Sequence, residues 1–499
     1  MPFLTRREVL AALAAAGAAP IWLELATGCG RGPAATASGA GMAVGRAVTD
    51  LRQQLRQIVT DLERVFPVAS ALAEVGSLRR VRVDEAATAV DQERTSRLVL
   101  AASDGTSWFE QATFDLSKAG IDDAAAALAV RARGGRRAAG GRARTAATTP
   151  AGKMRLDPRR TELARWIERV SGLHERTRGL GGSRIVYRAA SLEVEDADRL
   201  FVGEGRDEAR RVVRSQARVL FLAWDGETLL SEEASRAGAL GLEATDIPAD
   251  DLEEAVSGAL SLLTGRALPS GERDLVLDPT VAAMVVRHGI AAGLLADDWV
   301  GGAAHAASLA GKAVAPASIT LRDLPTADGA FGARGFDDEG WPAAPVALIE
   351  RGQLKGPLTC RATAAALGLG RTGHARRAEG SGPAAPRPTH LELATGSAGV
   401  DQLLAAVNDG FLVESGVGGR GDPTSWRFAV QARRAREIAR GRLTGRSYGP
   451  VVVGGSVAAL LGAARAVGDA PRVLAWRDPD PISVSAPHLV TRGWLGRGS

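Results

Sequence analysis

Short apolar segments separated by turn residues follow one another beyond Gly311, and this succession limits the fold more than any other feature of the chain. The segments are ASITLRDLP, FDDEGWPAAPVALIERGQLKGPL, THLELATG, GFLVESGVGGRGDPTSWRFAVQARRAREIARGRL and VLAWRDPDPISVSAPHLV. Short runs of this kind, bounded by turn residues, are typical of strands. A strongly twisted, barrel-like sheet buries many short strands without leaving open edges. We therefore predict a strand-rich C-terminal domain over residues 271–499, interrupted by helices near Gly399–Val407 and Gly455–Val467.

The preceding residues, 47–270, mix helices with strands. Apolar residues at three- and four-residue intervals predict an amphipathic helix from about Ala47 to Ala73. Segments around VRVDEA and RLVLAAS predict antiparallel strands with a turn signal at Asp104-Gly105, and three or four more strands are expected between RIVYR and DGETLL. Further helices are predicted at residues 121–130, 156–170 and 250–264. The fold class is therefore α+β: an N-terminal α/β domain with a mostly antiparallel sheet, followed by the strand-rich domain.

The composition agrees with this division into globular domains. A chain of 499 residues is long enough for two or three domains, since about 150 residues per domain is usual. The hydrophobic fraction of 45% and the charged fraction of 24% exclude disorder throughout. With only two cysteines, a framework of several disulfides is excluded as well.

The first 29 residues have the pattern of an export signal. Arg6 and Arg7 precede a short apolar run that is interrupted by Pro20 and Glu24, so the run is too short for a membrane-spanning helix. The adjacent arginines resemble the twin-arginine export pattern. We expect the protein to be exported by that route, to the periplasm or cell envelope, with residues 30–46 as a flexible Gly/Ala/Ser tether.

Cys29 ends a segment, LATGC, that resembles a lipoprotein cleavage box. Lipidation of this cysteine would hold the protein on a membrane surface, because each buried methylene of an acyl chain contributes about 0.8 kcal/mol. A plain cleaved signal with an incidental cysteine is the alternative. The residues alone leave both open.

A basic run covers residues 130–153 and contains much of the excess positive charge of a chain whose net charge is +5. Arginine interleaved with Gly and Ala lacks apolar periodicity, which predicts a flexible, solvated loop. Clustered cations also bind nucleic acid or anionic lipid, but no aromatic stacking residues are interleaved here. We therefore do not expect a nucleic-acid partner.

Several segments in order resemble the TldD/TldE family, whose TldE branch is also called PmbA. They are the stretch from Phe336 to Leu358, TGHARRAEG, RPTHLELATG and the stretch ending GRGDPTSWRFA, while GTSWFEQATFDLSKAGIDDAAAAL and FVGEGRDEARRVVRSQARVLFLA are similar to the family's first domain. The resemblance covers most of the chain from about Ala47 onward. It implies a metallopeptidase homologue with the two domains predicted above.

The resemblance also directs attention to VRHGIAAG, in a helix that opens with Asp278 as a capping residue. In the TldD branch the corresponding helix carries His-Glu-x-x-x-His, which binds zinc with a downstream cysteine while the glutamate activates water. Here His288 aligns with the first histidine, but Gly289 and Gly293 replace the glutamate and the second histidine. The segment from Trp476 to His488 has no cysteine, and Cys360 belongs to another motif. The resemblance thus implies no cofactor in this chain.

Other residues offer weaker candidates. Asp297, Asp298, His305, His374, His390 and His488 are the other donors weighed. They have no short repeat spacing, so a rebuilt metal site is only an alternative. Glycine at two helical positions implies that small size is needed, and one explanation is close approach of another backbone. The glycine-rich GVGGRG lacks the ending of a phosphate loop and predicts a strand connection that permits close backbone packing.

The family motifs also supply candidate residues for a peptide chamber. These are Asp337, Asp338, Glu339, Gly340, Arg376, Arg377, Gly421, Asp422 and Pro423. For the acidic triplet that precedes Gly340 the preferred interpretation is a solvated hairpin turn.

Three hypotheses for function follow. The first is a non-catalytic TldE-like subunit that pairs with a TldD-like zinc protease, or forms a homodimer, and acts on unfolded peptides. The second is an active metallopeptidase with relocated ligands. The third is a stand-alone scaffold or binding lipoprotein of the envelope.

Overall fold

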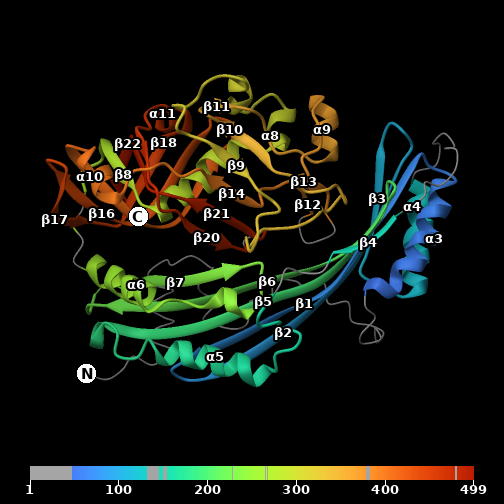
Figure 1. Cartoon of the computed structure of the whole chain (residues 1–499), viewed down its shortest axis with the longest axis horizontal. Coiled ribbons are helices and arrows are strands. Elements are labelled where there is room, and N and C mark those ends of the chain that lie inside the picture. Colours follow the sequence, from blue (N-terminus) through green and yellow to red (C-terminus); the bar gives the residue numbers. More distant parts are fainter. Residues whose placement is uncertain are drawn as a thin grey trace.

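A long curved sheet and a C-terminal domain that lies over one end of it make up the structure, a computed structural model (Figure 1). The described residues are 48–131, 145–149, 154–227, 229–263, 266, 268–377, 382–477 and 480–498. The predicted export signal, the tether, Cys29 and most of the basic loop lie outside them. Among the described residues, no helix combines the length and apolar composition that a membrane span requires.

Seven strands form the N-terminal sheet, in the order β3-β2-β1-β5-β6-β4, with β7 also paired to β6. Every pairing is antiparallel except that of β4 with β6, which confirms the predicted mostly antiparallel sheet. The bounds are β1 Val68–Asp84, β2 Thr88–Ser103, β3 Trp108–Thr113, β4 Thr145–Thr149, β5 Ile185–Gly203, β6 Arg206–Trp224 and β7 Leu229–Gly238. Strand β4 corrects the prediction for part of residues 130–153, since these five residues are a strand rather than a loop.

Four helices pack on this sheet: α3 (Arg52–Glu63), α4 (Lys118–Arg131), α5 (Leu163–Glu175) and α6 (Ala249–Leu262). Leu55 and Leu62 of α3 are buried against Leu200 and Val202 of β5. Neighbouring residues of a strand point to opposite faces, so Phe201 points away from this core. The N-terminal sheet is thus covered by helices on one face and by the C-terminal domain on the other.

Two predicted helix boundaries are wrong. The helix predicted from Ala47 to Ala73 ends at Glu63, because Pro67 precedes a strand and a residue before proline disfavours helical geometry. The helix predicted from residue 156 begins only at Leu163, after turns at residues 157–160.

A closed barrel of five strands forms the centre of the C-terminal domain, which confirms the predicted barrel-like sheet. Strands β15, β8, β22, β18 and β16 are neighbours in that order, and β16 pairs with β15 to close the circle. Their bounds are β8 Gly271–Leu277, β15 Asp409–Asp422, β16 Arg427–Ala439, β18 Val451–Ser456 and β22 Leu489–Arg497, with β17 Arg442–Tyr448 and β19 Ala466–Val467 added at the sides.

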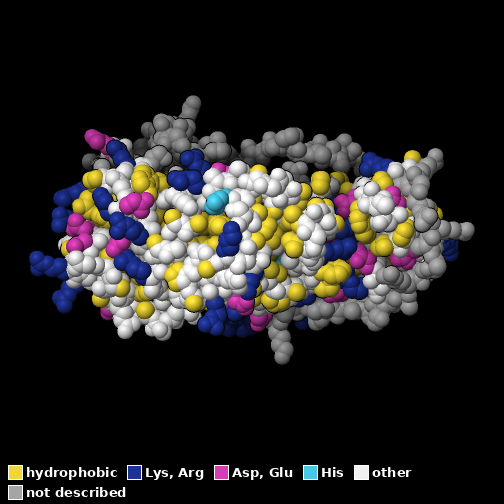
Figure 2. All heavy atoms as spheres, turned by 90° about the horizontal axis from the view of Figure 1, so that it is seen from above, with side chains coloured by type: hydrophobic (Ala, Val, Ile, Leu, Met, Phe, Trp, Pro, Cys, Tyr) yellow, Lys and Arg dark blue, Asp and Glu magenta, His cyan; other side chains and the backbone are white. Residues whose placement is uncertain are grey.

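A second sheet, in the order β11-β10-β9-β14-β21-β20, accompanies the barrel. The bounds are β9 Leu321–Asp323, β10 Val346–Glu350, β11 Gln353–Leu354, β14 His390–Leu393, β20 Arg472–Trp476 and β21 Ile482–Ala486, and a small hairpin comprises β12 Ala375–Arg377 and β13 Ala384–Pro386. The helices are α8 Ala296–Val300, α9 Arg361–Leu367, α10 Val400–Ala405 and α11 Val457–Gly462. The last two confirm the helices predicted near 399–407 and 455–467. On the outer face of this domain, apolar side chains gather along the middle and are flanked by charged ones (Figure 2).

One helical segment lies between the barrel and the second sheet and contacts both. It begins as α7 (Pro279–Met284), continues as a π-helix (Val285–Ile290, η4) and ends as a 3-10 helix (Ala291–Leu294, η5). Asp278 caps its start as predicted, because its Oδ1 accepts a hydrogen bond from the Val281 backbone N–H at 2.7 Å. We call residues 279–294 the central helix.

Candidate functional site

The central helix packs closely against strand β15, whose glycines make the approach feasible. A Cβ atom placed on Gly421 would lie 2.0 Å from the carbonyl oxygen of His288, and one on Gly416 would lie 2.8 Å from that of Thr280. Both separations are far below van der Waals contact, so only glycine fits. The prediction that GVGGRG permits close backbone packing is therefore confirmed, and the family motif at Gly421 lies directly against the degenerate helix.

The turn after Gly421 is held locally. The Oδ1 of Asp422 accepts a hydrogen bond from the Thr424 backbone N–H at 2.9 Å. The Ser425 hydroxyl is the leading reason that the pKa of Asp422 is lowered. Asp422 and Pro423 therefore shape the exposed β15–β16 turn.

Aromatic side chains fill the space beside Gly289 and Gly293. A Cβ on Gly293 would lie 2.3 Å from Cδ1 and 2.4 Å from Nε1 of Trp426, and a Cβ on Gly289 would lie 3.2 Å from Cγ of Phe428. The explanation by close approach of another backbone is thus wrong for these two glycines. A histidine at residue 293 would collide with the Trp426 indole, so the core has been repacked around the missing side chains.

Trp426 is itself held firmly in place. The residue is only 1% exposed, and its indole N–H donates a hydrogen bond to the carbonyl oxygen of Ile290 at 3.3 Å. A second indole, that of Trp299, donates to the carbonyl oxygen of Gly293 at 2.9 Å. The two tryptophans therefore satisfy two carbonyl groups near the end of the central helix.

His288 is half-buried and does not gather further ligands. Burial, together with the positive charge of Arg287, lowers the pKa of His288 to about 4, so the imidazole is neutral at pH 7. Arg287 turns to the Trp476 ring, with its guanidinium carbon 4.7 Å from the ring centre. Within the described ranges, no group of three His, Cys, Asp or Glu side chains is placed to hold a metal ion. Zinc sites need three or four such ligands, so these residues do not fit a zinc ion.

The other candidate donors serve different partners. His374 is fully buried with Nε2 3.2 Å from Asp323 Oδ1, and His390 has Nδ1 2.9 Å from the Ser483 hydroxyl. Cys360 directly precedes helix α9 as its N-cap residue, with its sulfur 3.5 Å from the Thr363 hydroxyl, and it is buried. Asp297 and His305 are exposed. These contacts are those of structural residues.

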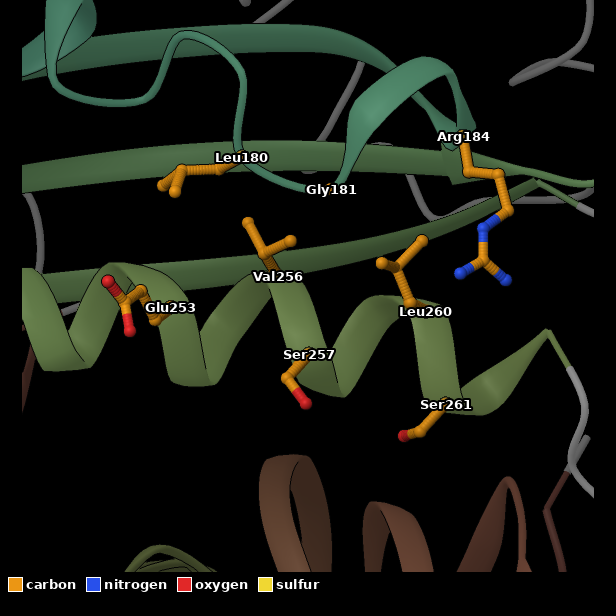
Figure 3. Close-up of a pocket in the computed structure, with 8 residues that line it drawn as sticks. All are labelled: Leu180, Gly181, Arg184, Glu253, Val256, Ser257, Leu260 and Ser261. Carbon is orange, nitrogen blue, oxygen red and sulfur yellow. The ribbon is translucent and has the colours of Figure 1, made fainter.

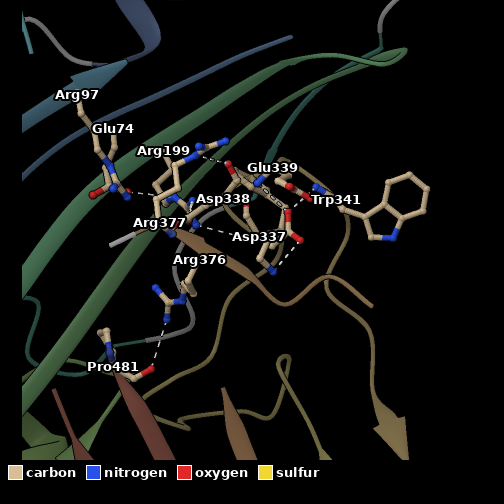
Figure 4. A network of polar contacts seen from close by, with 12 residues as sticks. Glu74, Arg97, Arg199, Asp337, Asp338, Glu339, Trp341, Arg376, Arg377 and Pro481 are labelled. Atoms are coloured by element: carbon tan, nitrogen blue, oxygen red, sulfur yellow. Dashed lines mark hydrogen bonds and ion pairs between the residues drawn. The ribbon is translucent and has the colours of Figure 1, made fainter. Parts of the chain in front are cut away.

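The acidic triplet lies at the junction of the two domains and is buried (Figure 4). Asp337, Asp338 and Glu339 are 1%, 3% and 7% exposed, so the predicted solvated turn is wrong. Asp337 accepts hydrogen bonds from the backbone N–H groups of Glu339 and Trp341, at 2.9 and 2.8 Å. Its second oxygen accepts one from Ala375 at 3.1 Å. The segment is a turn, but a turn covered by the N-terminal sheet.

Arginines from both domains neutralise Asp338. Arg199 of β5 forms an ion pair with it at 2.5 Å, and the Arg377 backbone N–H donates to it at 3.0 Å. Burial alone would raise the pKa of Asp338, but the charges of Arg199, Arg97 and Arg334 outweigh burial and hold the pKa below its usual range. Because Arg377 also pairs with Glu110 of β3 at 2.5 Å, the cluster binds the C-terminal domain to the sheet.

Glu339 and Gly340 complete this junction. Burial raises the pKa of Glu339 to about 7, although the charge of Arg361 opposes the shift, and the carboxylate accepts the Arg361 backbone N–H at 2.7 Å. Gly340 has a φ of +73°, and a Cβ there would lie 2.0 Å from the Phe201 ring. Arg376 donates to the carbonyl oxygen of Pro481 at 3.3 Å. The predicted residues thus form two groups, one at the central helix and one at the domain junction.

Sequence reasoning missed the residues that make the junction. Arg199, Glu110 and Phe201 are far from the acidic triplet along the chain, Arg361 follows Glu339 by 22 residues, and no local pattern singles them out. The contribution of Trp426 and Phe428 was missed as well, although both lie in the quoted motif TSWRFA.

A cavity of about 540 Å³ opens between helix α6 and the loop before β5, away from both groups. Figure 3 shows Glu253 and Arg184 at its opposite ends. The lining residues are Leu180, Gly181, Arg184, Glu253, Val256, Ser257, Leu260 and Ser261. None of them belongs to a predicted motif, and the lining contains no histidine or cysteine.

Several known proteins with similar sequences are named metalloproteases. The family model described as the PmbA/TldA metallopeptidase C-terminal domain matches residues 270–495. A protein named metalloprotease from Methanothermobacter thermautotrophicus is 30% identical over 244 residues, which are 47% of this chain and 53% of the relative. A metalloprotease TldD homolog from Haemophilus influenzae is 28% identical over 41% of this chain and 42% of its own length. The chain therefore matches only about half of the length of these relatives.

Solved structures share the fold over nearly the whole chain. TldE from Thermococcus kodakarensis superposes with a TM-score of 0.69 and 17% identity, over 89% of this chain and 99% of that one. A crystal structure from Bacteroides thetaiotaomicron gives a TM-score of 0.71 and 20% identity, over 90% and 99% of the two chains. The C-terminal domain, residues 270–495, belongs to the TldD/TldE (PmbA) family of metallopeptidase homologues, and the whole chain shares the fold of TldE.

Proposed function

We propose that this chain is a non-catalytic, TldE-like subunit that pairs with a TldD-like zinc protease acting on unfolded peptides. The observation that carries the proposal is the pair of aromatic side chains at Gly289 and Gly293. Trp426 occupies the space that the second zinc ligand would need, and Phe428 lies against the position of the general base. The second ligand is therefore not merely missing, since Trp426 leaves no room for a side chain at residue 293, while Phe428 makes a tight contact at residue 289.

The chemistry supports the same proposal. Hydrolysis at a zinc site requires three protein ligands and a positioned base. Loss of the base alone commonly costs a factor of about 10² to 10⁴ in rate. His288 can offer one neutral nitrogen and nothing described beside it offers the rest. Zinc would thus belong to the partner, and this chain would contribute shape to the peptide chamber.

The experiment compares this chain alone with the chain co-expressed with a relative that carries the intact His-Glu-x-x-x-His motif. Zinc content is measured by mass spectrometry, and cleavage of an unfolded protein such as reduced casein is measured with and without chelator. We expect the isolated chain to be zinc-free and inactive, and the pair to co-purify with zinc and chelator-sensitive activity. His288→Ala in this chain should leave that activity unchanged, whereas Glu→Gln in the partner motif should abolish it.

Two results would replace the proposal with its alternatives. Stoichiometric zinc and cleavage by the isolated chain, both lost in His288→Ala, would establish an active peptidase with relocated ligands. A homogeneous monomer or homodimer that ignores the co-expressed relative would favour the stand-alone envelope protein.

Export by the twin-arginine route is part of the proposal and rests on the sequence of residues 1–29. Fractionation of cells that express the full chain with a C-terminal tag tests it. We expect Arg6→Lys/Arg7→Lys to retain the protein in the cytoplasm. If Cys29 is lipidated, Cys29→Ala should move the protein from the membrane to the soluble fraction, and if the signal is simply cleaved, the variant should behave as the wild type does.

A further inference from the structure

Arg334 lies at the domain junction, and its charged group has no partner among the described residues. The residue is 2% exposed, and its Nε, Nη1 and Nη2 atoms are buried without a hydrogen-bond acceptor. Only its backbone is engaged, through the N–H group that donates to the carbonyl oxygen of Pro325 at 2.7 Å. Arg334 is thus a fixed, buried cation with all of its donors free.

Of the carboxylates that act on Arg334 electrostatically, Asp337 accepts backbone N–H groups and Asp338 pairs with another arginine. Asp338 pairs with Arg199 at 2.5 Å, and Glu195 pairs with Arg214 at 3.1 Å. Asp480 also acts on Arg334 electrostatically but forms no ion pair with it in the part of the chain that is described. The guanidinium of Arg334 is therefore near carboxylates but hydrogen-bonded to none of them.

Two more arginines converge on the loop that carries Arg334. Arg214 donates from Nε to the carbonyl oxygen of Phe331 at 2.7 Å, and Arg199 donates from Nη1 to that of Phe336 at 3.2 Å. Both come from the N-terminal sheet, and both add positive charge beside Arg334. Loop 331–336 consequently accepts hydrogen bonds from two cations of the other domain.

A buried guanidinium without acceptors is strongly unfavourable, because its five N–H donors lose their hydrogen bonds to water and its charge loses solvation. A water molecule would satisfy some donors but would not neutralise the charge. A small anion does both, and the fork of a guanidinium matches two acceptors at once.

We propose that Arg334 is the centre of a buried anion site that takes one small monovalent anion. The bound anion would accept hydrogen bonds from the unpaired donors of Arg334 between loop 331–336 and the N-terminal sheet, and so stabilise the contact between the two domains. The ligand is defined by its single charge and small size, which halides and formate share. This inference does not depend on the proposed function.

Thermal unfolding of the full chain tests the site with sodium bromide and sodium formate, titrated at constant ionic strength against gluconate, which is too bulky to enter. We expect the midpoint temperature to rise by several degrees and to saturate. Arg334→Met should remove this dependence, because no unpaired cation remains. Arg434→Met is the matched control, since Arg434 pairs with Glu414 at 3.0 Å, and it should keep the dependence.

A crystal of the wild type soaked in bromide gives a second measurement that does not rely on variants. We expect an anomalous peak within hydrogen-bond distance of the Arg334 guanidinium. Absence of the peak together with an unsaturable response would overturn the proposal. A crystal in which the Asp480 carboxylate pairs with Arg334 would also overturn it. The proposal expects Asp480→Asn to keep the anion dependence of the wild type. If Asp480 is the true partner of Arg334, the wild type shows no such dependence and Asp480→Asn creates it.

Discussion

The replacement Gly293→Ala tests whether Trp426 truly occupies the space of the missing ligand. A Cβ at residue 293 would lie 2.3 Å from Cδ1 of the indole, so the ring must move. Overpacking of a core typically costs about 1–3 kcal/mol, and loss of the hydrogen bond to Ile290 costs about 1 kcal/mol more. The higher helix propensity of alanine returns at most about 1 kcal/mol. We expect a net loss of about 1–3 kcal/mol in the free energy of unfolding.

Urea denaturation followed by far-ultraviolet circular dichroism measures this loss without depending on tryptophan fluorescence. Gly301→Ala is the matched control, because Gly301 has a φ of −81° and no atom of the described residues lies within 4 Å of a Cβ built there. Its effect should stay within about 0.5 kcal/mol.

A double variant assigns the loss to the indole. In a Trp426→Leu background the added methyl group has room, so the further cost of Gly293→Ala should fall below about 0.5 kcal/mol. If Gly293→Ala is as stable as the wild type, or if its cost is undiminished in the Trp426→Leu background, the aromatic filling is not what excludes a side chain here.

Three further predictions concern the domain junction. The pKa of Glu339 is about 7 in the folded state and about 4.5 in the unfolded state, so the folded state binds the proton more tightly. The free energy of unfolding should therefore fall by up to about 3 kcal/mol as pH rises from 4.5 to 7. Urea titrations of Glu339→Gln should not show this fall. The pH dependence that Asp338 contributes has the opposite sign, because its pKa is lowered in the folded state. The ionised carboxylate stabilises the fold above pH 4, and this stabilisation is lost in acid. Asp338→Asn should lower the free energy of unfolding by about 3 kcal/mol at pH 7 and reduce its dependence on pH in acid. Gly340→Ala should destabilise by about 2 kcal/mol or more through its clash with Phe201, whereas Gly302→Ala, with a similar φ of +70° and open space, should show only the backbone strain.

The elements whose formation is local could be predicted from the sequence. Alternation and turn residues predicted the strands of both domains, and Asp278-Pro279 predicted the start of the central helix, because capping and strand patterning depend on near neighbours. Closure of the barrel followed from the need to avoid open strand edges. The end of the first helix was missed because its apolar spacing continues past Pro67 into a strand.

The candidate site was predictable only in part. Acidic residues are rarely buried unless paired, so a solvated turn was the natural expectation for Asp337 and its neighbours. Their partners come from the other domain: Arg199 is 139 residues from Asp338 along the chain, and Glu110 is 267 residues from Arg377. A glycine in a helix also does not reveal which other side chain fills the space beside it. Both facts depend on tertiary packing, which the local pattern does not contain.

The order of strands in the barrel has a consequence for biosynthesis. Strand β22 inserts between β8 and β18, and its residues 489–495 pair with residues 271–277. Contacts between such distant segments slow folding, because a long loop must be ordered before they form. The barrel wall therefore stays open while the intervening chain is translated, and its apolar interior is exposed until β22 leaves the ribosome. Chaperone demand should peak in that interval.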